Sequence, residues 1–195
     1  MRVSLFPLNT VLFPGGPLPL RIFETRYIDM VKTCVRDDAP FGILLIREGK
    51  ETGPATTHDV GTLARITDWY QGSDGLLGIT AIGEQRFRLV SSERLDTGLN
   101  VGEIEILPDE PFVPMPDEYR SMADILSGVL DDLGLLYESL ERRLDDATWV
   151  TGRFMEILPI DLEDKQRCLE QGNAGERLEI VRALLQTVRS PLAID

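Results

Sequence analysis

Few residues of the chain could act as catalytic nucleophiles, bases or metal ligands. His58 is the only histidine, and it lies in the polar stretch Thr56-Thr57-His58-Asp59, where we expect a solvated turn residue rather than a proton-transfer group. Cys34 and Cys168 are far apart in the sequence, and with one histidine they cannot supply the four ligands of the usual structural zinc site. We therefore expect no catalytic residue and no metal site.

The chain also lacks the sequence of a phosphate-binding loop. The pattern GxxxxGK[ST] is absent, and the nearest segment, Gly42 to Lys50, places six residues between its glycines and is followed by Glu51. Gly72-Ser73-Asp74-Gly75 does not have the five-residue form of a nucleophile elbow, and hairpin-turn chemistry explains it better. We therefore predict a non-enzymatic chain that needs no cofactor.

Exposed apolar side chains are the remaining candidates for function. Trp69 and Tyr70 are adjacent on a predicted strand, so they point to opposite faces and at least one leaves the core. That ring is either covered by a helix or free to contact a peptide. The turn Leu12-Phe13-Pro14 also has two interpretations: it either plugs the end of the barrel or contacts a ligand peptide. We take Leu12, Phe13, Pro14, Trp69 and Tyr70 as candidate peptide-binding residues.

The segment Phe6 to Tyr27 must position the first of these residues. Its four prolines fix φ and withhold amide donors, which places it at sheet edges or in turns, and Gly15-Gly16 supplies the positive φ of a sharp reversal. Leu18, Leu20 and Ile22 then alternate as in a short strand. An apolar stripe of helical period follows, comprising Phe23, Tyr27, Met30, Val31, Cys34 and Val35. The order is strand, turn, strand, helix.

Strand-like segments continue to residue 107. We expect strands over Phe41 to Arg47, Gly61 to Gln71, Leu76 to Ile82, Arg86 to Leu95 and Asn100 to Leu107, with a polar loop from Glu48 to Val60. Six or seven strands with one early helix suit a small closed β-barrel, because closure hides strand edges.

The second part of the chain has a helical pattern. A proline-rich linker over residues 109–116 separates the barrel, residues 1–108, from a helical bundle over residues 117–190. Asp145 or Asp146 caps one of these helices, and Asp161 another. The fold class is thus α+β, a closed barrel followed by a helical lobe.

Composition excludes several classes of protein. The chain has a net charge of −13, and residues 109–195 carry 19 acidic against 9 basic side chains. Such a surface repels nucleic acid and anionic membranes. The apolar runs are far shorter than the ~18 residues of a spanning helix, and the first residues do not form a secretion signal. We therefore expect a cytoplasmic protein without nucleic-acid or membrane partners.

The sequence resembles the N-terminal domain of the Lon ATP-dependent protease family. The residues that carry the resemblance are Phe6-Pro7-Leu8, Leu12-Phe13-Pro14-Gly15, Leu18-Pro19-Leu20-Arg21-Ile22-Phe23-Glu24 and Arg26-Tyr27, and weaker similarity extends over nearly the whole chain. Thr25 stands where family members often have proline, at little physical cost. The resemblance implies a PUA-like barrel, and the absence of a Walker motif suggests a stand-alone domain without the ATPase and peptidase.

What the resemblance implies for function is binding of polypeptide substrates. We expect non-catalytic recognition of exposed apolar or unfolded segments, where apolar pockets and a free strand edge take an extended chain, with a separate protease or another protein as a further partner. Two alternatives remain open at this point: an assembly or adaptor module for a protein partner, and a small-molecule binder or enzyme with a pocket at the barrel mouth. The sequence does not determine the oligomeric state.

Overall fold

The computed structural model describes residues 1–138 and 140–189, with side chains up to residue 186. The chain divides into two compact units, Met1–Asp109 and Glu110–Asp195, which we describe separately. Residue 190, at the end of the predicted helical bundle, lies outside the described residues. None of the described helices combines the length and apolar character needed to cross a membrane.

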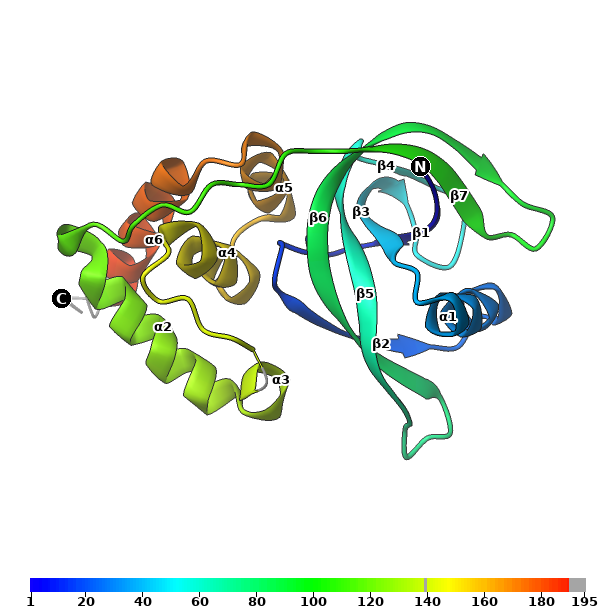
Figure 1. Ribbon diagram of the computed structural model, residues 1–195, viewed down its shortest axis with the longest axis horizontal. Coiled ribbons are helices and arrows are strands. Elements are labelled where there is room, and N and C mark those ends of the chain that lie inside the picture. Colours follow the sequence, from blue (N-terminus) through cyan, green and yellow to red (C-terminus); the bar gives the residue numbers. More distant parts are fainter. Residues whose placement is uncertain (139, 190–195) are drawn as a thin grey trace, which may run out of the picture. The chain divides into compact units, whose positions relative to one another are not determined.

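The first unit contains one helix and seven strands (Figure 1). In chain order they are β1 (Arg2–Leu8), β2 (Pro17–Ile22), α1 (Thr25–Asp37), β3 (Phe41–Gly49), β4 (Ala55–Thr57), β5 (Val60–Gln71), β6 (Leu77–Arg94) and β7 (Asn100–Ile106).

The seven strands form one mixed sheet. Its order is β1-β7-β6-β5-β3-β4, and β1 also pairs with β3, in parallel, so the pairings of β1, β7, β6, β5 and β3 form a closed ring. The other pairings are antiparallel. β2 pairs with β6 outside this ring, and β4 pairs with β3.

Two strand predictions are corrected. The segments predicted as separate strands on either side of residue 83 form one 18-residue strand, β6, because the residues between them stay in the ladder with β5. The predicted loop between residues 48 and 60 contains the short strand β4. The other predicted strands are present in the structure within a few residues.

Two groups of buried apolar side chains form the core of this unit. One lies under α1 and includes Phe6, Ile22, Tyr27, Phe41 and Ile79, and the other surrounds Phe87. Each fully buried side chain of this size contributes about 1.5–3 kcal/mol. The predicted stripe of α1 is correct for its four central members but wrong at both ends: Phe23 is 59% exposed and Val35 36%. Phe23 precedes the helix, which begins at Thr25, so its side chain does not follow the helical period.

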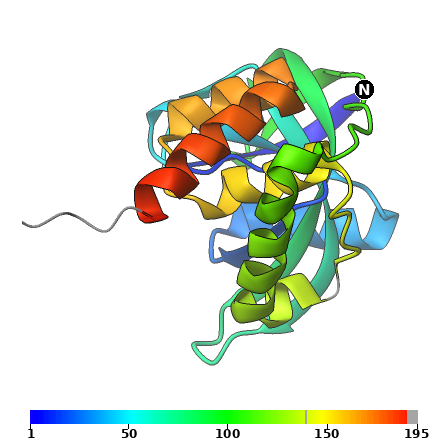
Figure 2. The ribbon, with the colours of Figure 1, turned by 90° about the vertical axis from the view of Figure 1, so that its left-hand side faces the viewer.

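The second unit is helical. Its elements are a short 3₁₀ turn η1 (Asp117–Tyr119), α2 (Arg120–Leu133), α3 (Leu135–Glu138), α4 (Ala147–Ile157), α5 (Leu162–Gln171) and α6 (Ala174–Arg189). α4 is buried on nearly all sides and contacts both α2 and α6, which lie in front of it in Figure 2.

Caps at the helix ends follow the sequence signals only in part. The Asp146 carboxylate accepts from the Thr148 backbone N–H at 2.9 Å, which confirms a cap at the start of α4. Asp161 occupies the N-cap position of α5, but its side chain makes no capping hydrogen bond. Gly172 ends α5 in the left-handed conformation, φ 61°, which glycine adopts without steric cost.

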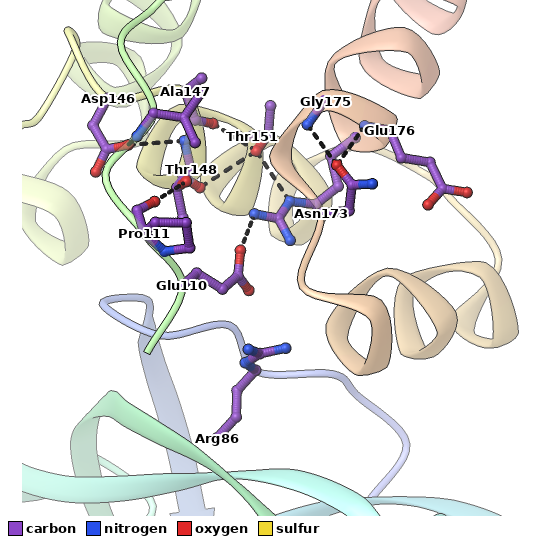
Figure 3. A network of polar contacts seen from close by, with 12 residues as sticks. Arg86, Glu110, Pro111, Asp146, Ala147, Thr148, Thr151, Asn173, Gly175 and Glu176 are labelled. Carbon is purple, nitrogen blue, oxygen red and sulfur yellow. Dashed lines mark hydrogen bonds and ion pairs between the residues drawn. The ribbon is translucent and has the colours of Figure 1, made fainter. Parts of the chain in front are cut away.

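The proline-rich segment that follows residue 109 is part of the helical unit. Pro114 and Asp146 form an isolated antiparallel bridge, and the Ala147 N–H donates to the Val113 carbonyl at 2.7 Å. Glu110 forms an ion pair with Arg177, a side chain that is 1% exposed and also donates to the Thr151 hydroxyl at 3.0 Å (Figure 3). Residues 110–116 are therefore held by hydrogen bonds and by a buried charge.

Candidate functional site

The turn that contains Leu12, Phe13 and Pro14 faces the interior. The Gly16 N–H donates to the Phe13 carbonyl at 3.0 Å and Gly15 has φ 75°, the pattern of a type II turn with proline at its second position. Leu12 is 3% exposed and Phe13 1%, whereas Pro14 is partly buried. Burial leaves Leu12 and Phe13 almost no surface for a ligand, so we no longer place them in the site.

Two contacts fix this turn to the sheet. The Thr62 hydroxyl donates to the Leu12 carbonyl at 2.5 Å. The backbone of Gly83, in β6, accepts from Gly15 N–H at 2.7 Å and donates to the Gly16 carbonyl at 2.8 Å. A Cβ on Gly83 would lie 2.4 Å from the Phe13 carbonyl oxygen, so the approach requires glycine. The turn is a structural anchor.

Trp69 and Tyr70 are both exposed, by 58% and 49%, on opposite faces of β5. Trp69 pairs across the sheet with Ile79, which pairs with Leu20 of β2, so these three side chains share one face. Tyr70 lies on the other face, where its ring covers Gly78: an added Cβ there would be 2.5 Å from the ring. The structure thus separates the two predicted aromatic residues.

A groove in the first unit opens beside Leu20. It has a volume of about 320 Å³ and lies among residues of β1, β2 and the start of α1. The lining residues are Phe6, Leu8, Pro19, Leu20, Arg21, Ile22, Phe23, Glu24, Tyr27 and Glu51. We call this the β2 groove. Since Phe23 is 59% exposed, a large apolar side chain stands at its rim in water.

Aromatic stacking makes the floor of the β2 groove rigid. The rings of Phe6 and Tyr27 lie 3.9 Å apart between centroids and are inclined by 19°. The Arg26 guanidinium lies 4.5 Å from the Tyr27 centroid and donates to the carbonyls of Gly98 and Glu51 at 2.9 and 3.2 Å. Burial raises the pKa of the Tyr27 hydroxyl. The groove is therefore formed before any ligand arrives.

The free edge of β2 is poor in hydrogen-bond donors. Among the described strands β2 pairs with β6 alone, and Pro17 and Pro19 occupy alternate positions. Because proline cannot donate to a ladder, prolines in an edge strand turn their nitrogen away from the neighbour. Of the alternate residues 17, 19 and 21, whose nitrogens then point to the outer edge, only Arg21 has an N–H. One donor is too few for another strand to pair there.

Charged groups at the rim are mostly paired. Arg26 forms an ion pair with Glu24 at 2.9 Å, and Arg21 forms one with Asp74 in the β5–β6 turn. The Glu51 carboxylate accepts from the Asn9 backbone N–H at 2.7 Å.

The residues that could have carried catalysis do not gather at this groove. His58 is 8% exposed, so its predicted position in a solvated turn is wrong; its N–H donates to the Leu45 carbonyl at 3.0 Å. Cys34 and Cys168 are free and buried, and burial raises the pKa of the Cys34 thiol to about 11. Within the described residues no group of three or more acidic, histidine or cysteine side chains could hold a metal ion.

Residues 2–187 match the model of the ATP-dependent protease La (LON) substrate-binding domain. The chain belongs to this family. A crystal structure of a Lon N-terminal domain protein from Xanthomonas campestris is 33% identical, with a TM-score of 0.75, over 94% of this chain and 98% of that one. The N-terminal domain of a Mycobacterium avium complex Lon protease, 15% identical, has the same fold, with a TM-score of 0.60 over 93% of this chain and 96% of that one.

The curated relatives are longer proteins. Lon protease of Anaeromyxobacter dehalogenans is 23% identical over 99% of this chain, and the match covers 24% of that protein. Cereblon of Danio rerio is 30% identical over 54% of this chain and 25% of its own length. The chain thus spans about a quarter of the length of these relatives. The Lon resemblance predicted from the sequence is confirmed, and its most specific motif, Leu18 to Glu24, provides most of the β2 groove.

Sequence reasoning missed Phe23 and Leu20 as surface residues of the site. The structure shows why: Glu24 has extended backbone dihedrals, and the helix begins only at Thr25. A helix start placed at Thr25 would have left Phe23 outside the helical stripe. Its exposure could then have been considered from the sequence.

Proposed function

We propose that this Lon substrate-binding domain binds exposed apolar segments of unfolded polypeptides in the β2 groove, without chemistry of its own. The family supports a role in substrate recognition. The observation that carries the proposal is the half-exposed Phe23 at the rim of a preformed apolar groove, with Leu20 inside it and Trp69 on the same face of the sheet. Exposed aromatic side chains of this kind are typical binding anchors.

The size of the groove suits side chains rather than a whole peptide. A volume of about 320 Å³ is at the lower end of the range for ligand sites, roughly 300–1,000 Å³. It accommodates one or two large apolar side chains. Such a site gains affinity from apolar area removed from water, a non-directional term, so it tolerates many sequences.

The prolines of β2 bear on how the ligand backbone is held. The free strand edge expected from the sequence lacks donors at Pro17 and Pro19, so strand addition gains few backbone hydrogen bonds. We propose that recognition relies on side-chain insertion. Peptides with N-methylated backbone amides would then bind nearly as well as unmodified ones.

We further propose that the closed ring of strands is the PUA-like barrel expected from the sequence. The pairing of β1 with both β7 and β3 supports this architecture. A closed ring fixes the floor residue Phe6 relative to β2 and keeps the groove open in the absence of ligand.

Trp69 provides an intrinsic reporter for the test. A labelled, unfolded polypeptide without tryptophan is titrated with the domain, and binding is followed by anisotropy of the label and by tryptophan emission. We expect saturable binding and a blue shift, because the exposed Trp69 ring loses water while Trp149, 8% exposed, is already shielded from water. In the control Trp69→Phe the shift disappears. A folded domain that shows no saturable binding would refute the proposal.

A further inference from the structure

One carboxylate of the β2 groove has no cationic partner among the described residues. Of the acidic side chains that line the groove, Glu24 forms an ion pair with Arg26. Glu51 makes a different contact: its Oε1 accepts from the backbone N–H of Asn9, and none of the ion pairs of the described residues includes it. The groove thus places a partly buried negative charge beside an apolar floor.

The neighbouring arginine side chains do not neutralise the Glu51 carboxylate. Arg26 lies close to Glu51, but its guanidinium donates to the Gly98 and Glu51 carbonyls and pairs with Glu24. The positive charge of Arg94 acts to lower the pKa of the Tyr27 hydroxyl, but Arg94 is exposed to solvent, where its field is screened.

The charge of the whole chain acts in the same direction. The net charge of −13 attracts cationic segments over long range and repels acidic ones. A cationic residue near the inserted apolar side chain would therefore be attracted electrostatically, both during approach and in the bound state.

We propose that the β2 groove selects apolar segments that carry a lysine or arginine next to the inserted residue, with the cationic head placed against the Glu51 carboxylate. This rests on the proposed function and adds the charge of its ligand. An extended chain advances about 3.3–3.6 Å per residue. A lysine one or two residues from the inserted side chain therefore starts about 3–7 Å from it along the backbone and carries its ammonium on a flexible four-carbon stem.

The test compares three labelled peptides with the same apolar core, flanked by lysine, serine or glutamate. Anisotropy gives the dissociation constant of each at low and high salt. We expect the lysine peptide to bind about three- to fivefold more tightly than the serine peptide at low salt, as for a partly exposed ion pair, and the glutamate peptide to bind most weakly. The difference shrinks as salt is raised.

Two variants separate the Glu51 carboxylate from the overall charge. Glu51→Gln keeps an oxygen that accepts from Asn9 N–H and removes only the charge, so we expect it to abolish most of the lysine preference, measured as the ratio of the dissociation constants of the serine and lysine peptides. Glu105→Gln, on the exposed face of β7, makes the same change of net charge and retains the preference.

The outcomes distinguish this inference from the proposed function. Equal binding of all three peptides, or tighter binding of the glutamate peptide, overturns the inference but leaves polypeptide binding in place. An equal loss of preference in both variants also overturns it, because the overall charge would then be the cause. Absence of binding by every peptide refutes the proposed function itself.

Discussion

Replacing Phe23 by alanine tests the β2 groove most directly. An aromatic side chain covers about 150–250 Å² when fully buried, so the 59% that Phe23 exposes leaves about 120 Å² for a ligand to cover. At about 25 cal/mol per Å², complete coverage contributes about 3 kcal/mol and coverage of half that area about 1.5 kcal/mol. We therefore expect Phe23→Ala to weaken binding of an apolar peptide by about tenfold or more.

The same substitution leaves the fold nearly unchanged. Because more than half of Phe23 is already in water, its removal is expected to alter the free energy of unfolding by about 0.5–1 kcal/mol at most. Peptide affinity is measured by anisotropy, and stability by urea unfolding followed by circular dichroism.

Phe112 supplies a matched control for this experiment. It has the same exposed fraction, 59%, and lies in the helical unit, outside the β2 groove. Phe112→Ala therefore removes the same exposed apolar area without changing the groove. An equal loss of affinity in the two variants, or full affinity in Phe23→Ala, would refute the assignment of the site.

Three further substitutions test the packing of the first unit. Gly83→Ala places a Cβ 2.4 Å from the Phe13 carbonyl oxygen and should lower the free energy of unfolding by about 1–3 kcal/mol, measured by urea unfolding. Thr62→Val removes the donor to the buried Leu12 carbonyl and should cost about 1–3 kcal/mol in the same assay. Burial raises the pKa of the Cys34 thiol from 9.0 to about 11, so the unfolded thiol ionises first. Stability is full below pH 9 and falls by about 2 kcal/mol as pH rises to 11, a decrease that Cys34→Ala should remove from the pH profile of unfolding.

Two of these three substitutions have a control in the same chain. Gly53 has no atom within 4 Å of an added Cβ, so Gly53→Ala should be neutral. Thr67 makes a similar hydroxyl-to-carbonyl bond, 3.2 Å to Thr80, but it is exposed, and Thr67→Val should cost less than about 0.5 kcal/mol. Equal effects in test and control would contradict the packing argument. An unchanged alkaline slope in Cys34→Ala would exclude that thiol as its cause.

Much of the fold follows from local sequence signals. Alternation in Leu18 to Ile22 predicts β2, and Pro14-Gly15 predicts the turn before it, because both depend on the dihedral preferences of a few residues. The predicted cap at Asp146 is also local, and it is present. Such signals need no information about distant parts of the chain.

The candidate site could be predicted only in part, because exposure depends on distant partners. Phe13 and Phe23 are the same residue type in neighbouring motifs, yet one is 1% and the other 59% exposed. The burial of His58 and the anchoring of Leu12 by Thr62 likewise depend on residues remote in the sequence. The sequence predicts that Trp69 and Tyr70 lie on opposite faces of their strand. It does not predict which of them shares a face with Leu20, because that depends on the register of β5, β6 and β2.

The hydrogen bonds of residues 110–116 have a practical consequence for dividing the chain. In the first unit the Arg86 guanidinium donates to the Pro108 carbonyl at 3.2 Å, and the next unit begins at Glu110. A fragment that started at Asp117 would lose the carboxylate that pairs with Arg177 and the residues bonded to the first turn of α4. Separate expression of the helical half should therefore begin at Glu110.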